Sequence, residues 1–317
     1  MSTINILCCT DEQYAPFYGI MLTSLFDNNK GDSFEIFVLT AGLEEKTIAD
    51  FQTLVNSNHS KLSVIIVDES RLRNCPIREG DHVTLATYYR LLTPILLPDI
   101  ERVLYIDGDI IINKSIKPLW DTDITGKALA AVIDEDYNGE DRHQRLNIPQ
   151  HIPYFNAGVL LINLKYWREH DVINRCMLCI ETMADKLLFH DQDTLNVVLN
   201  KEIKLLPLTY NFQRGFIDYA FYNHMDSKYQ EEINEIKYNP TVIHFTGYSK
   251  PWHEGCRHPY TSHFLFYWQK SLWHDMPLMA NTQSLKQRFM QIRNEIIWVL
   301  GIKKRPKTYL IERQAKR

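Results

Sequence analysis

Short apolar segments alternate with amphipathic ones through the first part of the chain, and this alternation is what most restricts the fold. Segments of strand length, rich in Ile, Val, Leu and Phe, are separated by segments whose apolar residues recur every three or four positions. The expected strands are Ile4–Cys9, Phe34–Thr40 and 61–67, and the expected helices are 14–25 and 44–55. Parallel strands need crossover connections of this kind, so the pattern predicts an α/β fold with a mainly parallel, Rossmann-like sheet.

The rest of the chain continues this pattern and then loses it. Further strands are expected at 103–106, 128–133, 158–164 and 241–244, and further helices at 85–92, 172–186, 264–273 and 285–300. Aromatic residues become dense after residue 204, and regular periodicity is weak there. No repeat or Pro- or Ser-rich linker divides the 317 residues. We therefore expect one main domain, 1–283, followed by a helical C-terminal extension, 284–317.

The charge of the chain is unevenly distributed. The formal net charge is −4, which argues against nucleic acid as a partner. The extension 284–317 carries ten Lys or Arg residues and two Glu residues, a local charge of +8, so that residues 1–283 carry −12. Basic and apolar residues interleave in this extension, which is typical of a segment that binds an anionic membrane surface. A solvated basic helix is the alternative.

Cysteine usage and the N-terminus bear on the cellular compartment. The six cysteines include one Cys-x-x-Cys pair, Cys176 and Cys179, without the second pair that a zinc site needs. Structural thiols in a reducing compartment are the expected case. The first residues resemble no signal peptide, and no apolar run reaches the ~18 residues of a membrane span. These features predict a cytoplasmic protein, with peripheral contact to the inner face of the membrane as an option.

Two aspartates follow the expected strand 103–106. Asp107 and Asp109 are separated by Gly108, which would let the backbone approach a ligand closely. Ligands of open α/β sheets bind beyond the carboxyl ends of the strands. Neighbouring carboxylates repel each other unless a cation lies between them, and their oxygens suit a hard divalent ion. The apolar strand places the pair in the interior, so the sequence predicts a metal site; a solvent-exposed turn is the alternative.

A histidine ends the strand 241–244 and begins a second motif. His244 is followed by Gly247 and Lys250. Imidazole could supply a third metal ligand, and a glycine and a lysine would suit a diphosphate. A buried histidine without a ligand is the more frequent case, so this motif alone decides nothing.

Two shorter motifs are equally ambiguous alone. Residues 190–193, His-Asp-Gln-Asp, lie at an expected helix start, where Asp191 or Asp193 could be the N-cap. Residues 156–158, Asn-Ala-Gly, precede an apolar strand, and such small residues allow a ligand to pass close by.

Together and in this order, the four motifs resemble the retaining glycosyltransferases of family 8. This family includes bacterial lipopolysaccharide galactosyl- and glucosyltransferases and, more distantly, glycogenin. The resemblance covers residues 4–252. It implies a GT-A fold, that is, a nucleotide-diphospho-sugar transferase domain. It also implies transfer of glucose or galactose from a UDP-sugar to a saccharide acceptor, in the synthesis of lipopolysaccharide or another surface glycan.

The resemblance further implies roles for individual residues. Asp107, Asp109 and His244 would hold Mn²⁺, with Mg²⁺ as the alternative ion. In the first βα turn, Asp11 would bind the uracil edge and Tyr14 would stack on the ring. The other implied positions are Cys9, Thr10 and Gln13 in that turn, Gly108 beside the metal, Arg90 at the donor sugar and phosphate, Gly247 and Lys250 at the diphosphate, and Asp134, Asn156, Ala157, Asp191 and Gln192 around the hexose.

The chemistry of the reaction agrees with these roles and leaves one choice open. A nucleotide diphosphate gains negative charge as it leaves, and a metal ion, Lys250 and Arg90 would stabilise that charge. Asp191 and Gln192 would stabilise the oxocarbenium-like sugar, and these are the expected catalytic residues. No second acidic pair at nucleophile spacing is found, so we favour attack by the acceptor on the same face that the leaving group departs from. Gln192 as a transient nucleophile is the other option.

Three other functions share features with this sequence. A phosphatase of the haloacid dehalogenase type has its Asp-x-Asp after the first strand, with Thr or Val two residues beyond; here the motif lies past residue 100 and Ile111 takes that place. A non-catalytic relative that binds a nucleotide sugar or lipid would have lost a metal ligand, and all three are present. Self-glucosylation, as in glycogenin, would need an accessible tyrosine in the aromatic segment 210–222.

Overall fold

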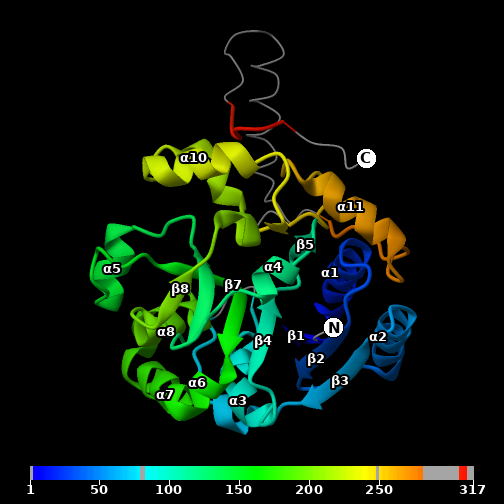
Figure 1. Cartoon of the computed structure of the whole chain (residues 1–317), viewed down its shortest axis with the longest axis horizontal. Helices are drawn as coiled ribbons and strands as arrows, with labels where there is room; N and C mark the ends of the chain where they lie inside the picture. Colours follow the sequence, from blue (N-terminus) through cyan, green and yellow to red (C-terminus); the bar gives the residue numbers. More distant parts are fainter. Residues whose placement is uncertain (1–2, 79–82, 248–249, 281–306, 313–317) are drawn as a thin grey trace.

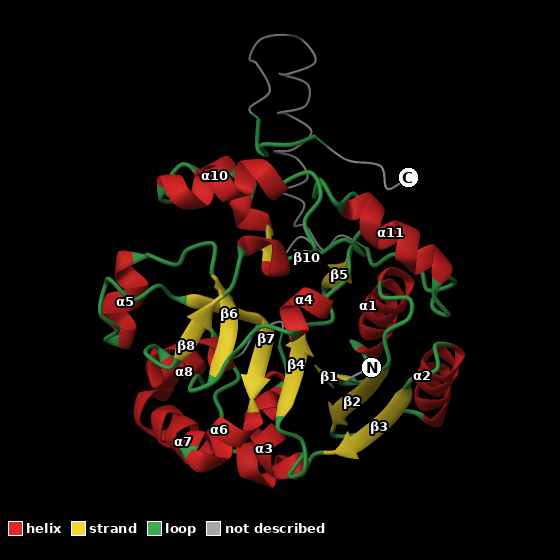
Figure 2. Ribbon diagram, viewed as in Figure 1, coloured by secondary structure: helices red, strands yellow, loops and turns green. Residues whose placement is uncertain are grey.

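A mixed sheet forms the centre of the molecule. The computed structural model describes residues 3–78, 83–247, 250–280 and 307–312. Within them a seven-stranded sheet has the order β3-β2-β1-β4-β7-β6-β8 (Figure 2). Its strands are β1 (Ile4–Cys9), β2 (Phe34–Thr40), β3 (Lys61–Ile66), β4 (Arg102–Ile106), β6 (Leu129–Ile133), β7 (Phe155–Asn163) and β8 (Ile203–Leu205). Strand β7 is antiparallel to β4 and β6, and the other neighbours are parallel. The predicted α/β fold with a mainly parallel sheet is confirmed.

Helices flank this sheet (Figure 1). They are α1 (Ala15–Asn28), α2 (Glu45–Ser57), α3 (Thr93–Leu96), α4 (Lys117–Trp120), α5 (Glu140–Leu146), α6 (Leu164–Glu169), α7 (Val172–Met183), α8 (His190–Leu199), α9 (Tyr219–Tyr222), α10 (Ser227–Ile236) and α11 (Thr261–Lys270). Short 3₁₀ helices are η1 (Glu69–Leu72), η2 (Leu85–Leu92), η3 (Ala184–Lys186), η4 (Leu208–Asn211) and η5 (Arg214–Phe216). The expected helix at 285–300 lies outside the described residues.

The central strands β1, β4, β6 and β7 are mostly apolar because both faces of the sheet are covered there, whereas the edge strands β3 and β8 are largely exposed or half-buried. Along β1, Ile4, Ile6 and Cys8 belong to an apolar cluster that includes side chains of α1 and α11. Their neighbours Leu7 and Cys9 point to a second cluster, which includes side chains of η2, α6 and α7. A parallel sheet buried on both faces has this pattern, whereas a sheet with one solvated face would alternate apolar and polar residues.

A second, smaller sheet lies beyond the carboxyl end of β4 (Figure 2). Its order is β5 (Ile110–Ile112), β10 (Val242–His244) and β9 (Phe212–Gln213). Strands β5 and β10 are antiparallel, with His244 opposite Ile110. Phe245 also donates its backbone N–H to the Asp109 carbonyl at 3.0 Å. This pairing joins segments more than 130 residues apart, and it brings the end of β10 beside the residues that follow β4.

The described C-terminal segment, 307–312, packs against the residues around Ile217 and Tyr219. The Tyr219 N–H donates to the Thr308 carbonyl at 3.1 Å, and the Leu310 N–H donates to the Ile217 carbonyl at 2.8 Å. The side chain of Ile311 is buried. The division of the chain at residue 283 stays a prediction, since 281–306 lie outside the described residues.

Two further expectations concern cysteines and the membrane. All six cysteines are free and buried, as expected for structural thiols. Among the helices that the structure describes, none is long and apolar enough to cross a membrane.

Candidate active site

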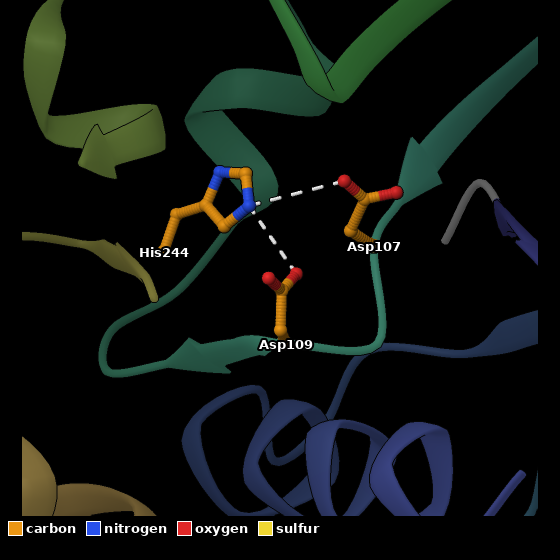
Figure 3. A group of neighbouring side chains, drawn as sticks. All are labelled: Asp107, Asp109 and His244. Atoms are coloured by element: carbon orange, nitrogen blue, oxygen red, sulfur yellow. Dashed lines mark ion pairs between the residues drawn. The ribbon is translucent and has the colours of Figure 1, made fainter. Parts of the chain in front are cut away.

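The three predicted metal ligands meet at the carboxyl end of β4. Asp107 is the first residue after β4, and its N–H donates to the Gly158 carbonyl of β7 at 2.9 Å. Asp109 lies just before β5, which β10 pairs with. His244, the last residue of β10, places its Nε2 atom 3.2 Å from Asp109 Oδ1 and 3.8 Å from Asp107 Oδ2 (Figure 3). One ligand atom from each residue lies within 4.8 Å of the others. Two carboxylates and an imidazole form a donor set that suits Mn²⁺.

Charges around this cluster favour ionised aspartates. The Lys250 ammonium bonds to Asp109 Oδ2 at 2.5 Å and to the Phe245 carbonyl at 2.9 Å. Burial alone would raise the pKa of Asp109, but Lys250 and His244 outweigh it and hold that pKa well below its usual range. Burial alone would lower the pKa of His244, whereas Asp109 and Asp107 raise it above that of a free imidazole. The cluster therefore attracts a cation, either a proton on His244 or a metal ion.

Arg90 connects the predicted metal ligands to the predicted hexose site. Its buried guanidinium lies 3.1 Å from Asp191 Oδ2 through Nε and 3.4 Å from Asp107 Oδ1 through Nη2. Its Nη1 donates to the Ala157 carbonyl at 2.6 Å. Thr87 donates its hydroxyl to Asp191 Oδ1 at 2.5 Å. Burial raises the pKa of Asp191, and Arg90 acts against that rise. Arg90 thus fixes the relative positions of two acids from different elements.

Gln192 and Asp134 are also held in one network. The Gln192 amide oxygen accepts the Ala157 N–H at 2.8 Å, and its amide nitrogen lies 3.3 Å from Asp134 Oδ2. The Asn156 amide donates to the same Asp134 oxygen at 3.2 Å. Arg142 donates to the other Asp134 oxygen at 2.8 Å. Because a backbone N–H can only donate and a carboxylate can only accept, the orientation of the Gln192 amide is determined.

The predicted nucleotide turn lies at the carboxyl end of β1, next to β4 in the sheet. Asp11 Oδ1 accepts the Tyr14 N–H at 3.0 Å, and Asp11 Oδ2 accepts the Thr84 hydroxyl at 2.9 Å. The Tyr14 ring meets Trp252 edge to face. Cys9 and Thr10 are buried, and Gln13 is exposed. The hydrogen bonds of the Asp11 carboxylate therefore stabilise the turn. The side chain of Gln13 is exposed to solvent.

Glycine is required at one position between the ligands. A Cβ atom on Gly158 would lie 2.3 Å from His244 Cε1 and 2.8 Å from Asp107 Oδ2. Gly108 is also close-packed, since a Cβ there would lie 2.8 Å from the Tyr18 ring. These contacts give the physical reason for the Asn-Ala-Gly and Asp-Gly-Asp motifs. Gly247 has a φ of +79°, in the left-handed region that favours glycine.

The four residues 190–193 have different surroundings. The N-cap residue of helix α8 is Phe189, so neither Asp191 nor Asp193 is the N-cap. Asp193 is buried and accepts hydrogen bonds from Arg145 at 2.8 Å and from the Tyr154 hydroxyl at 2.7 Å. It holds the start of α8, whereas Asp191 and Gln192 reach the site.

The sequence analysis missed several residues that border the site. Asn211 lies 2.8 Å from His244 Nδ1. Glu135 accepts the Gly215 N–H at 2.7 Å and the Thr246 hydroxyl at 3.0 Å, and burial raises its pKa. Arg142 holds Asp134. For Asn211 the available signal was a polar side chain within an apolar and aromatic segment. Glu135 and Arg142 lie in polar runs, 134–136 and 140–145, which single out neither residue.

The chain was compared with known families and proteins. The sequence model of the family Glycosyl transferase family 8 matches residues 5–256 of this chain. General stress protein A of Bacillus subtilis is 29% identical over 275 residues, covering 85% of this chain and 94% of that protein. Lipopolysaccharide 1,2-glucosyltransferase of Escherichia coli is 28% identical over 280 residues, covering 87% and 80%. Lipopolysaccharide 1,3-galactosyltransferase of Salmonella typhimurium is 27% identical over 294 residues, covering 90% and 83%.

A solved structure of a glycosyltransferase is also similar to this chain. The galactosyltransferase LgtC, in complex with donor and acceptor sugar analogues, superposes with a TM-score of 0.77 at 28% identity. The match covers 90% of this chain and 99% of that one. The family match spans most of the chain and includes all four motifs. The protein therefore belongs to glycosyl transferase family 8 and is a hexosyltransferase with a GT-A fold.

Proposed function

We propose that the protein is a metal-dependent, retaining enzyme that moves glucose or galactose from a UDP-sugar to a saccharide acceptor. The observation that carries this proposal is the Asp107, Asp109 and His244 cluster at the carboxyl end of β4, joined to Asp191 through Arg90. The relatives that are lipopolysaccharide glucosyl- and galactosyltransferases support glucose or galactose as the transferred sugar and point to an acceptor in lipopolysaccharide or another surface glycan.

The diphosphate of the donor would bind beside this cluster. Mn²⁺, with Mg²⁺ as the alternative, would be held by Asp107, Asp109 and His244 and would act as a Lewis acid on the leaving diphosphate. The Lys250 ammonium, now bonded to Asp109, lies where it could bind an anionic oxygen. The left-handed turn at Gly247 brings backbone close to the same place. Asp11 and Tyr14, with Cys9, Thr10 and Gln13, would hold the uridine at the end of β1.

We propose a transfer in which the acceptor, not Gln192, is the nucleophile. The bond between the anomeric carbon and the diphosphate oxygen breaks, and the acceptor oxygen forms its bond on the same face, so configuration is retained. The acceptor proton passes to the departing phosphate oxygen. The Gln192 amide oxygen already accepts the Ala157 N–H, which reduces its strength as a nucleophile. We therefore assign Gln192, with Asp191, to stabilisation of the oxocarbenium-like sugar.

The hexose would lie among Asp134, Asn156, Ala157 and Asp191. Asp134 accepts from Arg142, Asn156 and Gln192 and so serves mainly to orient the amides around it. Arg90 would contribute positive charge near the donor phosphate while it holds Asp191 in place.

Peripheral binding to an anionic membrane through 284–317 is part of the proposal. Acceptors of the lipopolysaccharide type are attached to lipid, and the local charge of +8 would bring the enzyme to the cytoplasmic face of the membrane.

One assay tests the proposal and separates its rivals. The full chain is incubated with UDP-glucose or UDP-galactose, with and without Mn²⁺, and UDP release and intact protein mass are measured. We expect Mn²⁺-dependent UDP release from one of the two donors, abolished by a chelator, with no mass added to the protein. Absence of UDP release from both donors in the presence of Mn²⁺ would overturn the assignment. Addition of hexose units to the protein would instead support self-glucosylation.

A further inference from the structure

We propose that Asn211 is a positioning residue that fixes the tautomer of His244 in which Nε2 can bind a metal ion. Asn211 is the last residue of η4 and is fully buried. It contacts His244 on the side of the ring opposite to Asp107 and Asp109. The inference rests on the proposed metal-dependent function, and it adds a residue that none of the four motifs contains.

The argument starts from a group whose role in hydrogen bonding is fixed. The backbone N–H of Gly158 can only donate, and it donates to Asn156 Oδ1 at 2.9 Å. The other end of the Asn156 amide, Nδ2, donates to Asp134 Oδ2 at 3.2 Å. A backbone donor on one side and a carboxylate acceptor on the other leave a single orientation for this amide. Asn156 therefore presents an oxygen, not a nitrogen, to Asn211.

The orientation of Asn156 determines that of Asn211. Asn211 Nδ2 donates to Asn156 Oδ1 at 2.8 Å. Its carbonyl oxygen Oδ1 consequently faces His244 Nδ1, at 2.8 Å. An amide oxygen cannot donate, so Nδ1 must carry the hydrogen of this bond. In a neutral imidazole the other nitrogen, Nε2, then keeps its lone pair, and this atom faces the two aspartates.

Burial makes the alternative tautomer costly. Asn156, Asn211 and His244 are all buried, so water cannot replace a lost partner. With the hydrogen on Nε2, the lone pair of Nδ1 would face the Asn211 oxygen, and two buried acceptors would oppose each other. Groups that bond the second nitrogen of a metal-binding histidine fix its tautomer, and their removal typically lowers metal affinity or activity by about 10–100-fold.

Two variants separate the hydrogen-bond acceptor from the packing at this position. Asn211→Leu has a similar size and no acceptor. Asn211→Asp keeps an acceptor for His244 Nδ1 while it changes the contact with Asn156. Asn29→Leu is the control, because Asn29 is another buried asparagine whose side chain bonds to the backbone of Leu25 and Ile116, neither of which belongs to the site.

Two measurements are made on each variant. Mn²⁺ binding in the presence of UDP is followed by electron paramagnetic resonance of the free ion. Long-range ¹H–¹⁵N correlation spectra of the metal-free protein, recorded at a pH high enough that the His244 ring is neutral, show which imidazole nitrogen carries the hydrogen, and His244→Gln identifies the signals of His244. We expect Mn²⁺ affinity about 10–100-fold lower in Asn211→Leu, and within about threefold of wild type in Asn211→Asp and Asn29→Leu. Wild type should show hydrogen on Nδ1.

The possible results decide the inference in each case. Hydrogen on Nε2 in neutral His244 of the wild type overturns it, even if no variant folds. A folded Asn211→Leu protein that binds Mn²⁺ as tightly as the wild type also overturns the inference. So does a loss of Mn²⁺ affinity in Asn211→Asp that equals the loss in Asn211→Leu. If the wild type binds no Mn²⁺, the proposed metal dependence fails, while the spectra still test the tautomer.

Discussion

At the scale of single residues, Asp109 is the ligand with the most opposing charge around it. It bonds to Lys250 and lies 3.2 Å from His244, so its removal leaves a half-buried lysine and a buried histidine without their shared partner. We expect Asp109→Ala to abolish nearly all transfer, because two remaining ligands cannot hold Mn²⁺ beside Lys250. UDP release is the measurement, and Asp123→Ala, at an exposed aspartate, is the control. Turnover above about a tenth of wild type with the same Mn²⁺ dependence would contradict the assignment.

His244 should make metal binding dependent on pH. Its pKa is raised by Asp109 and Asp107 against the effect of burial, so a proton competes with the metal ion at higher pH than on a free imidazole. Mn²⁺ affinity should therefore be full above this raised pKa and fall as pH drops through it. The dissociation constant is measured against pH for wild type and for His244→Gln, which should be weaker and less dependent on pH. A wild-type profile that stays flat as the pH drops from alkaline values to well below the pKa of a free imidazole would count against His244 as a ligand.

Gln192 offers a test of the mechanism at one amide. If it only stabilises the sugar, Gln192→Ala should retain measurable transfer with retained configuration, because the acceptor hydroxyl is the nucleophile. If it is the nucleophile, Gln192→Ala should abolish transfer and Gln192→Glu should trap a glycosyl-enzyme. We expect the first result. Intact mass spectrometry of Gln192→Glu decides the question: an adduct of one hexose that disappears when acceptor is added would support the covalent route.

At the scale of elements, the close approach of β7 to the ligands gives a test that removes no ligand. Gly158→Ala would place a methyl group 2.3 Å from His244 Cε1, so either His244 or β7 must shift. We expect a large loss of Mn²⁺ affinity with the fold retained. Gly42→Ala is the matched control, because a Cβ there meets nothing within 4 Å. Mn²⁺ titration and circular dichroism of both variants provide the measurement. Unchanged Mn²⁺ affinity in Gly158→Ala would contradict the close packing of Gly158 against His244 and Asp107.

The elements also show what a sequence can and cannot predict. Strands β1 and β2 have the bounds that were expected, because a buried strand between turn residues is a local signal. The small sheet was not foreseen as a unit, since β5 and β9 are only three and two residues long and their partner β10 lies far along the chain. The sequence placed Asp107, Asp109 and His244 in one site only through the resemblance to a family. Asn211 could not be found, because its role depends on contacts with Asn156 and His244.

At the scale of the whole molecule, the C-terminal region combines two properties that must be tested separately. The extension 284–317 carries the basic charge, while its described part, 307–312, is bonded to Ile217 and Tyr219. The Tyr309 ring also lies beside the guanidinium of Arg214. The backbone N–H of Arg214 donates to the hydroxyl of Thr246, which lies between His244 and Gly247. Deletion of the whole extension would therefore remove packing contacts together with the charge. Substitution of a few basic residues lowers the charge without deleting the described segment 307–312.

The triple substitution Lys303→Gln, Lys304→Gln and Arg305→Gln makes this separation. Each basic residue near an anionic surface contributes on the order of 1 kcal/mol, so the three together should lower vesicle binding by about 100-fold. Mn²⁺-dependent UDP-sugar hydrolysis should stay unchanged, while transfer to a lipid-linked acceptor slows more than transfer to a soluble one. High salt should have the same effect on the wild type, because the attraction decays over a Debye length of ~10 Å at 0.1 M ionic strength. Sedimentation with anionic and neutral vesicles is the measurement, and Tyr309→Ala, which disturbs the packed segment but no charge, is the control. If wild type fails to sediment with anionic vesicles at low salt, the extension has no membrane role and its charge only keeps it solvated.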